Sequence, residues 1–201
     1  MKYSSEFKCL KEQCPHNCCS NTEIKLSVID LLKINETLGV TYANANFKFG
    51  DASAHLYIDQ KTGYPYAVMN NKNNSCPLLK NSLCIIHEKT LKDTPLGRTL
   101  KDKGLSTSAL PLICRSYPLA IFYPENGKLE LNSGCKGVTE MKWEYVSKTP
   151  ELIEAMREAS IYKAIIKKDM IKQIQNNTLL QKTRELLEAI TDDELEKTTF
   201  S

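Results

Sequence analysis

The chain has 201 residues, enough for one domain with a substantial core or for a domain with a helical addition. Apolar residues make up 41% and charged residues 25%, which excludes a wholly disordered chain. The net charge of +3 is too small to indicate a nucleic-acid or membrane partner, and no apolar run approaches the ~18 residues of a membrane span. The first residues lack the apolar stretch of a signal peptide, so we expect a cytoplasmic protein in a reducing compartment.

Residues 1–23 are predicted to form a polar loop that carries half of the eight cysteines in the pattern C-x4-C-x3-C-C, namely Cys9, Cys14, Cys18 and Cys19. Thiolates are soft ligands for zinc, iron and iron–sulfur clusters. Donors a few residues apart on one loop can converge on one centre without a long loop closure. Adjacent side chains usually point apart, so one cysteine of the Cys18–Cys19 pair could serve a second centre or redox chemistry.

A helix is predicted to follow this loop. Ser27 and Asp30 have the spacing of a capping box, apolar residues then follow at helical intervals, and Gly39 suits the C-terminal stop. We expect this helix to pack on the core.

Residues 54–59 and 64–69 predict two strands of a hairpin, joined by a short turn that contains a glycine. The segment 84–88 predicts the start of a helix, on which Cys84 and His87 would share a face. His87 could ligate a metal or orient a ligand, but an isolated histidine is more often an ordinary residue. His16, inside the cysteine-rich loop, is a slightly better candidate ligand.

Residues 93–111 are interpreted as a long connection with little periodicity. Arg115, next to Cys114, could stabilise a thiolate or offset the charge of a cluster, and a solvated arginine is the alternative. The segments 119–123 and 128–132 predict a second hairpin over an Asn-Gly turn. Cys114 and Cys135 flank that hairpin, which would bring them to one edge of a small sheet.

From Thr149 onward the pattern is helical. Thr149-Pro150 is typical of a helix start, apolar residues keep helical spacing to residue 174, and the segment 179–190 predicts another helix. A helical layer on the core is the main interpretation, and a surface for a protein partner is the alternative.

The dispersed cysteines are Cys76, Cys84, Cys114 and Cys135. Disulfides are one alternative to metal binding, but sequence could not assign their pairing, and four crowded cysteines without a secretory signal favour metal. Burial as small apolar side chains is a second alternative, above all for Cys76.

Six short segments of the sequence carry a resemblance to known proteins. They are the Cys18-Cys19 opening, Leu38-Gly39, Cys76-Pro77-Leu78-Leu79, Leu83-Cys84-Ile85-Ile86-His87, Cys114-Arg115-Ser116-Tyr117-Pro118 and Ser133-Gly134-Cys135. The chain resembles the YkgJ-type cysteine-cluster family of zinc- or iron-chelating proteins, and the N-terminal part of the flagellin lysine N-methylases, over roughly residues 7–138. The resemblance implies metal or iron–sulfur binding by these cysteines. The spacing of the opening is closer to the methylases, but those are much longer, and the chain has neither a G-x-G-x-x-G loop nor a C-x3-C-x2-C run.

Three functions are compatible with these observations. The first is a metal-binding protein. We expect it to hold an iron–sulfur cluster, preferably with four irons, or else zinc or iron. The second is a structural zinc module for protein–protein interaction, with the C-terminal helices as the partner surface. The third is a protein lysine N-methylase that depends on S-adenosylmethionine. Spacing cannot decide between zinc and iron, because thiolates suit both.

We expect an α+β fold, with small hairpins and helices around a cysteine-ligated metal centre in residues 1–140 and a helical C-terminal extension in residues 141–201 packed on it. No acid–base pair or nucleophile set stands out. The predicted ligands, in order of preference, are Cys9, Cys14, Cys18, Cys114 and Cys135, and then Cys19, Cys76 and Cys84. We predict that Cys14→Ser strips the metal and that His87→Ala largely does not.

Overall fold

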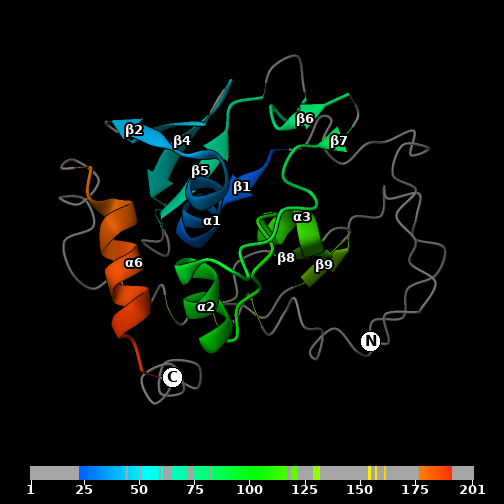
Figure 1. Cartoon of the computed structure of the whole chain (residues 1–201). Helices are drawn as coiled ribbons and strands as arrows, with labels where there is room; N and C mark the ends of the chain where they lie inside the picture. Colours follow the sequence, from blue (N-terminus) through cyan, green and yellow to red (C-terminus); the bar gives the residue numbers. More distant parts are fainter. Residues whose placement is uncertain are drawn as a thin grey trace, which may run out of the picture.

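A computed structural model describes residues 23–43, 45–49, 51–58, 60, 65–71, 75–81, 83–116, 119–121, 129–131, 154, 157, 161 and 177–191. The fold is α+β, as the sequence predicts: an antiparallel sheet of five strands is combined with helices and two small hairpins (Figure 1). The predicted loop 1–23, with His16 and four of the cysteines, lies outside the described residues apart from Glu23. Cys135 and most of the first predicted C-terminal helix also lie outside them.

The large sheet has the strand order β1-β5-β4-β3-β2, and every neighbouring pair is antiparallel. Its strands are β1 (Lys25–Leu26), β2 (Thr41–Ala43), β3 (Asn46–Phe49), β4 (Ala52–Ile58) and β5 (Pro65–Met69). β4 and β5 confirm the predicted hairpin, with Leu56 opposite Ala67 in the register. Side chains alternate between a buried inner face and an outer face, as expected for an antiparallel sheet with one solvated side.

Helix α1 (Val28–Leu38) lies on the inner face of this sheet and confirms the predicted helix. The Ser27 hydroxyl accepts a hydrogen bond from the Asp30 N–H at 2.9 Å, and the Asp30 carboxylate accepts one from the Ser27 N–H at 3.0 Å. Gly39 ends the helix with φ at +70°, a conformation that favours glycine.

The remaining described elements are short. They are the hairpin of β6 (Leu79–Lys80) and β7 (Leu83–Cys84), helix α2 (Pro95–Asp102), helix α3 (Leu112–Ser116), the hairpin of β8 (Leu119–Ile121) and β9 (Leu129–Leu131), and helix α6 (Leu179–Ala189). The β8–β9 pair and α6 confirm the predicted second hairpin and last helix, with Leu119 opposite Leu131.

Two predictions about this region are wrong. The segment 84–88 is not a helix: Cys84 ends a strand and hydrogen-bonded turns follow it. The stretch 93–111 is not irregular throughout, because it contains α2.

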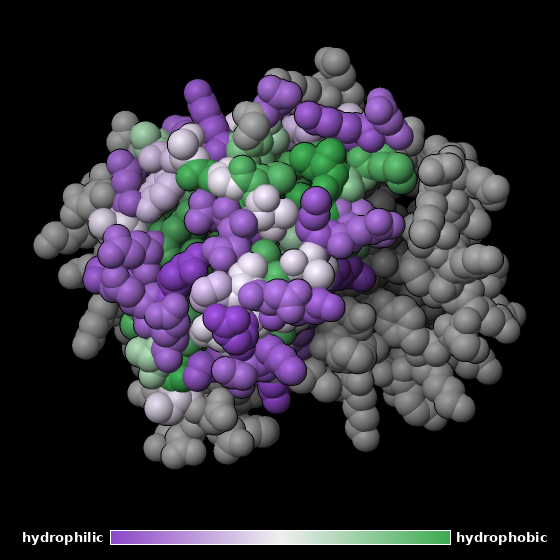
Figure 2. All heavy atoms as spheres, viewed as in Figure 1, coloured by the Kyte–Doolittle hydropathy of each residue, from purple (hydrophilic) through white to green (hydrophobic). Residues whose placement is uncertain are grey.

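One hydrophobic core joins residues from Ile24 to Ile190. Helix α6 packs against both α1 and α2, so apolar side chains from both ends of the described chain share this core. On the face of the molecule that Figure 2 shows, hydrophilic residues cover α2 and α6, and a hydrophobic area lies near the β6–β7 hairpin. No helix in the described part of the chain is long and apolar enough to cross a membrane.

Candidate metal centre

The β6–β7 hairpin carries two of the predicted ligands. Leu79 is opposite Cys84 in the register, and the Ile85 N–H donates to the Leu78 carbonyl at 2.9 Å, which extends the pairing away from the hairpin tip. Cys76 lies just before this pairing and Cys84 lies within it. Both cysteines therefore belong to the same small unit.

Each of these cysteines occupies the first position of a hydrogen-bonded turn. The Cys76 carbonyl accepts from the Leu79 N–H at 3.0 Å, and the Cys84 carbonyl accepts from the His87 N–H at 3.0 Å. Pro77 is the second residue of the first turn, where its fixed φ favours this geometry. Such turns keep the first and fourth Cα atoms within about 7 Å of one another. Both cysteines therefore begin a turn of the same hydrogen-bonding pattern on one small unit.

The three described cysteines differ in their exposure to solvent. Cys76 is 5% exposed and belongs to the core, whereas Cys84 and Cys114 are half-buried and pack against it. Packing as a small apolar side chain therefore accounts for Cys76 by itself, but it accounts less well for the other two. No disulfide joins any two of these three residues.

His87 is exposed at the end of the second turn. The turn keeps its backbone near that of Cys84, although the shared helical face expected for the two residues does not exist. Its exposure agrees with the interpretation of His87 as an ordinary surface residue.

Cys114 lies on α3, which is tied to α1 through a buried carboxylate. The second oxygen of Asp30 accepts a hydrogen bond from the Leu112 N–H, the first residue of α3, at 3.0 Å. Asp30 is 1% exposed, so this bond is shielded from water. One residue thus caps α1 and also fixes the helix that carries Cys114.

The structure gives Arg115 a partner that the sequence did not indicate, and its expected role beside a thiolate stays a prediction. Its guanidinium donates to both carboxylate oxygens of Glu154, at 2.5 and 2.9 Å, and to the Leu110 carbonyl at 3.0 Å. Its side chain is 14% exposed, so a solvated arginine is a wrong description. The guanidinium charge is directed to Glu154, which sequence reasoning did not single out.

Glu154 lies at the centre of a buried charge cluster. Lys33, fully buried on α1, lies 3.5 Å from its Oε1, and the Ser106 N–H donates to the same oxygen at 2.7 Å. Burial raises the pKa of Glu154, but the hydrogen bonds and positive charges of Arg115 and Lys33, with the Ser106 N–H, outweigh it and hold this pKa below its ordinary value. Glu154 is therefore ionised at neutral pH. Lys33 is the sequence feature that could have indicated this cluster, because it is a lysine among the apolar positions of the predicted helix.

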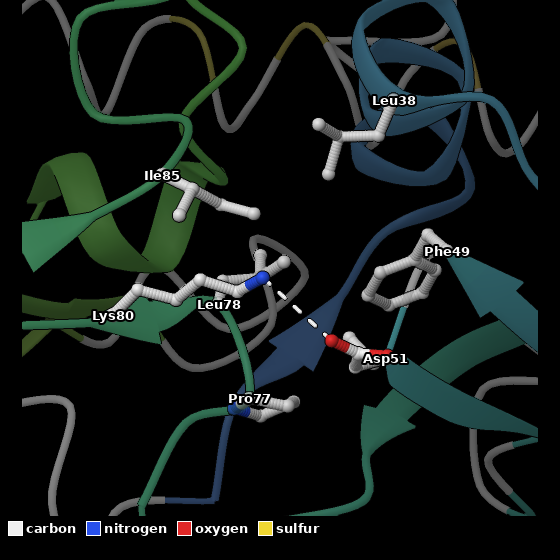
Figure 3. A pocket seen from close by; sticks show the side chains of 8 residues that line it. Leu38, Phe49, Asp51, Pro77, Leu78, Lys80 and Ile85 are labelled. Carbon is white, nitrogen blue, oxygen red and sulfur yellow. Dashed lines mark ion pairs between the residues drawn. The ribbon is translucent and has the colours of Figure 1, made fainter.

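A small apolar pocket of about 130 Å³ separates the β6–β7 hairpin from the large sheet (Figure 3). Leu78 and Ile85 of the hairpin line it on one side, and Leu38 and Phe49 line it on the other. The Lys80 ammonium reaches across it to Asp51 at 3.7 Å, but both side chains are more than half exposed, so this ion pair adds little stability. Most of the residues that line the pocket are therefore apolar, and the ion pair lies at its solvent-exposed side.

Among the described residues, no three His, Cys, Asp or Glu side chains are grouped closely enough to hold a metal ion. Cys76, Cys84 and Cys114 thus do not form a site by themselves. Further ligands would have to come from the cysteines that lie outside the described residues: Cys9, Cys14, Cys18, Cys19 and Cys135.

Comparisons with known proteins supply no relative: no protein-family model, curated protein or solved structure matches the chain. The functional interpretation therefore rests on the cysteines themselves.

Proposed function

We propose that this protein binds a metal centre through its cysteines. The preferred centre is an iron–sulfur cluster with four irons, and zinc or mononuclear iron is the alternative. The observation that carries the proposal is the pair of matched turns on the β6–β7 hairpin, which places Cys76 and Cys84 on one small unit. The spacing of the eight cysteines, on which the resemblance to the YkgJ-type cysteine-cluster family is based, also supports it.

The donor chemistry suits both kinds of centre. A closed zinc site and a four-iron cluster each take four thiolates, and sulfur is a good ligand for both metals. The hairpin unit supplies two cysteines, Cys76 and Cys84, and the C-x4-C-x3-C-C loop has four more. A reducing cytoplasm, which we also propose as its location, keeps these thiols available as ligands.

Purification under anaerobic conditions, followed by iron, sulfide and zinc analysis and an absorption spectrum, tests the proposal. Iron and sulfide in equal amounts, with a brown chromophore, support the cluster. A colourless protein with stoichiometric zinc would support the structural zinc module instead, particularly if chelation unfolds it. A folded protein with neither metal would overturn the proposal.

Single substitutions test the ligand assignment. We expect Cys14→Ser and Cys84→Ser each to lower the metal content of the purified protein to less than about half, because loss of one thiolate leaves a site incomplete. His87→Ala is the matched control, since it removes a metal-binding side chain next to Cys84 that is exposed, and it should retain the wild-type content. Full metal retention in both serine variants would contradict the assignment.

The methylase hypothesis stays a separate prediction. Calorimetry with S-adenosylmethionine on metal-loaded protein tests it, and the absence of binding would remove it.

A further inference from the structure

Helix α3, which carries Cys114, is too short to be stable by itself. It has five residues, and isolated helices of that length do not persist in water, so its position depends on contacts with the rest of the chain. At its start, the Cys114 and Arg115 N–H groups both donate to the Pro111 carbonyl at 3.0 Å. Side chains from other parts of the chain supply further support.

Two buried carboxylates attach α3 to the rest of the molecule. Asp30 of α1 accepts a hydrogen bond from the Leu112 N–H at the first residue of the helix. Glu154 accepts two hydrogen bonds from the guanidinium of Arg115, near the end of the helix. Leu112 precedes Cys114 by two positions and Arg115 follows it directly, so the cysteine lies between the two points of attachment.

The attachment to Glu154 fixes an orientation as well as a distance. All three guanidinium nitrogens of Arg115 are engaged, two with Glu154 and Nε with the Leu110 carbonyl at 3.0 Å. A planar guanidinium that makes paired bonds to a carboxylate has a defined geometry, which a lysine cannot reproduce. The position of Arg115, and of the end of α3, therefore depends on Glu154.

The environment of Cys114 suits a ligand that is held ready for metal. Its side chain is half-buried and packs against the hydrophobic core. A donor whose backbone is already fixed loses little conformational freedom when it binds. Groups that orient a ligand without touching the metal typically change metal affinity by roughly 10–100-fold.

We infer that Glu154 is a positioning residue for the metal centre: through Arg115 it fixes α3 and with it the Cys114 thiol, so that metal binding and the docking of Glu154 stabilise each other. The inference rests on the proposed metal centre, with Cys114 as one of its ligands. The mutual stabilisation follows because any contact that favours the binding position of Cys114 is itself favoured by bound metal.

Transfer of metal from loaded full-length protein to a colorimetric chelator, pyridylazoresorcinol for zinc or bathophenanthroline for iron, tests the inference. Arg115→Lys keeps the positive charge but loses the paired bonds, so we expect metal to leave at least about tenfold faster than from the wild type. Glu154→Gln should have the same effect. If Arg115 acted on the thiolate by its charge alone, neither variant would release metal faster, because both keep that charge.

The matched control separates positioning from a general loss of stability. Leu187 is fully buried on α6, so Leu187→Ala weakens the core without changing a contact of Arg115 or Glu154. We expect its metal release to stay within about twofold of the wild type. The charge-transfer absorption of the loaded protein, with cobalt in place of zinc or from the cluster itself, should change in Arg115→Lys and not in Leu187→Ala.

The Ser106 N–H allows the reverse measurement, because it donates to Glu154 Oε1 at 2.7 Å. Its hydrogen exchange, followed by nuclear magnetic resonance, reports on the docking of Glu154. We expect Cys114→Ser to speed this exchange at least about fivefold relative to the metal-loaded wild type. The Leu56 N–H, which donates to the Ala45 carbonyl at the large sheet, is the reference amide and should stay within about twofold.

Two results would overturn the inference and leave the metal centre in place. The first is metal release from Arg115→Lys and Glu154→Gln that is no faster than from Leu187→Ala. The second is exchange of the Ser106 amide that Cys114→Ser leaves unchanged or alters no more than that of Leu56. Wild-type protein that holds no metal after anaerobic purification would overturn the proposed function as well, so the two failures are distinguishable.

Discussion

Glu154 receives hydrogen bonds or positive charge from three distant parts of the chain. Lys33 comes from α1, Arg115 from α3 and the Ser106 N–H from the connection between α2 and α3. Removing one member of a buried charge cluster is costly, because the opposite charges stay buried without it. At the scale of single residues, this cluster joins the helix that covers the sheet to the helix that carries Cys114.

Glu154→Gln tests this role. The amide keeps the shape of the side chain but removes its charge, so we expect unfolding in urea to show a loss of about 3–5 kcal/mol. Glu185→Gln is the matched control, since Glu185 pairs with Lys182 in solvent on α6 and its loss should change stability little. Equal stability of the two variants would contradict a structural role for the cluster.

The lowered pKa of Glu154 gives the same residue a pH signature. A carboxyl whose folded pKa lies below its unfolded value, near 4.5, stabilises the protein above that value, and the contribution is lost as pH falls through the folded pKa. Urea unfolding from pH 7 downward should therefore show wild-type stability falling below about pH 4.5 more steeply than that of Glu154→Gln.

At the scale of elements, α2 has a clear start signal in the sequence but too short an apolar pattern to be predicted as a helix. Thr94 caps it by accepting a hydrogen bond from the Gly97 N–H at 3.0 Å, and Pro95 occupies its first turn. The helix buries only Leu96, Gly97 and Leu100, so its apolar pattern is too short to stand out. Gly97 in its first turn has a low helix propensity, although close packing against Leu91 explains that glycine.

Gly97→Ala should destabilise the protein even though alanine favours helices. A Cβ at this position would lie 1.7 Å from the Leu91 carbonyl oxygen, which is backbone and cannot simply rotate away. We expect a loss of about 1–3 kcal/mol in urea unfolding. Lys101→Ala, an exposed position on the same helix, should stay within about 0.5 kcal/mol. A neutral or stabilising effect of Gly97→Ala would show that α2 is packed less closely against residue 91.

At the scale of the whole molecule, α6 completes the core. It packs on α1 and α2 with Leu179, Leu180 and Leu187 buried, and Arg184 donates to Glu36 of α1 at 2.8 Å. Helix α1, which precedes α6 by more than a hundred residues, thus depends on it for part of its burial.

Leu187→Ala should lower the free energy of unfolding by about 2–5 kcal/mol, because Leu187 is fully buried and its loss leaves a cavity. Its neighbour Leu186 is 36% exposed, so Leu186→Ala should cost much less and serves as the control. Similar losses for the two variants in urea unfolding would contradict the packing of α6 on α1 and α2.

The sequence alone predicted the elements whose signals are local. Ser27, Asp30 and Gly39 mark both ends of α1, alternation and short turns mark the β4–β5 and β8–β9 hairpins, and helical spacing marks α6. The eight cysteines and their grouping are likewise a property of the sequence, and metal binding by them stays a prediction.

Only the tertiary structure decided which distant groups meet. The burial of Lys33, the pairing of Arg115 with Glu154 and the bond from Leu112 to Asp30 join residues far apart in the chain. The pairing of Leu79 with Cys84 and the stacking of Tyr57 on Tyr66 depend on strand register. Local patterns specify how a segment folds, but charge pairing and strand pairing between segments depend on how the whole chain buries its apolar surface.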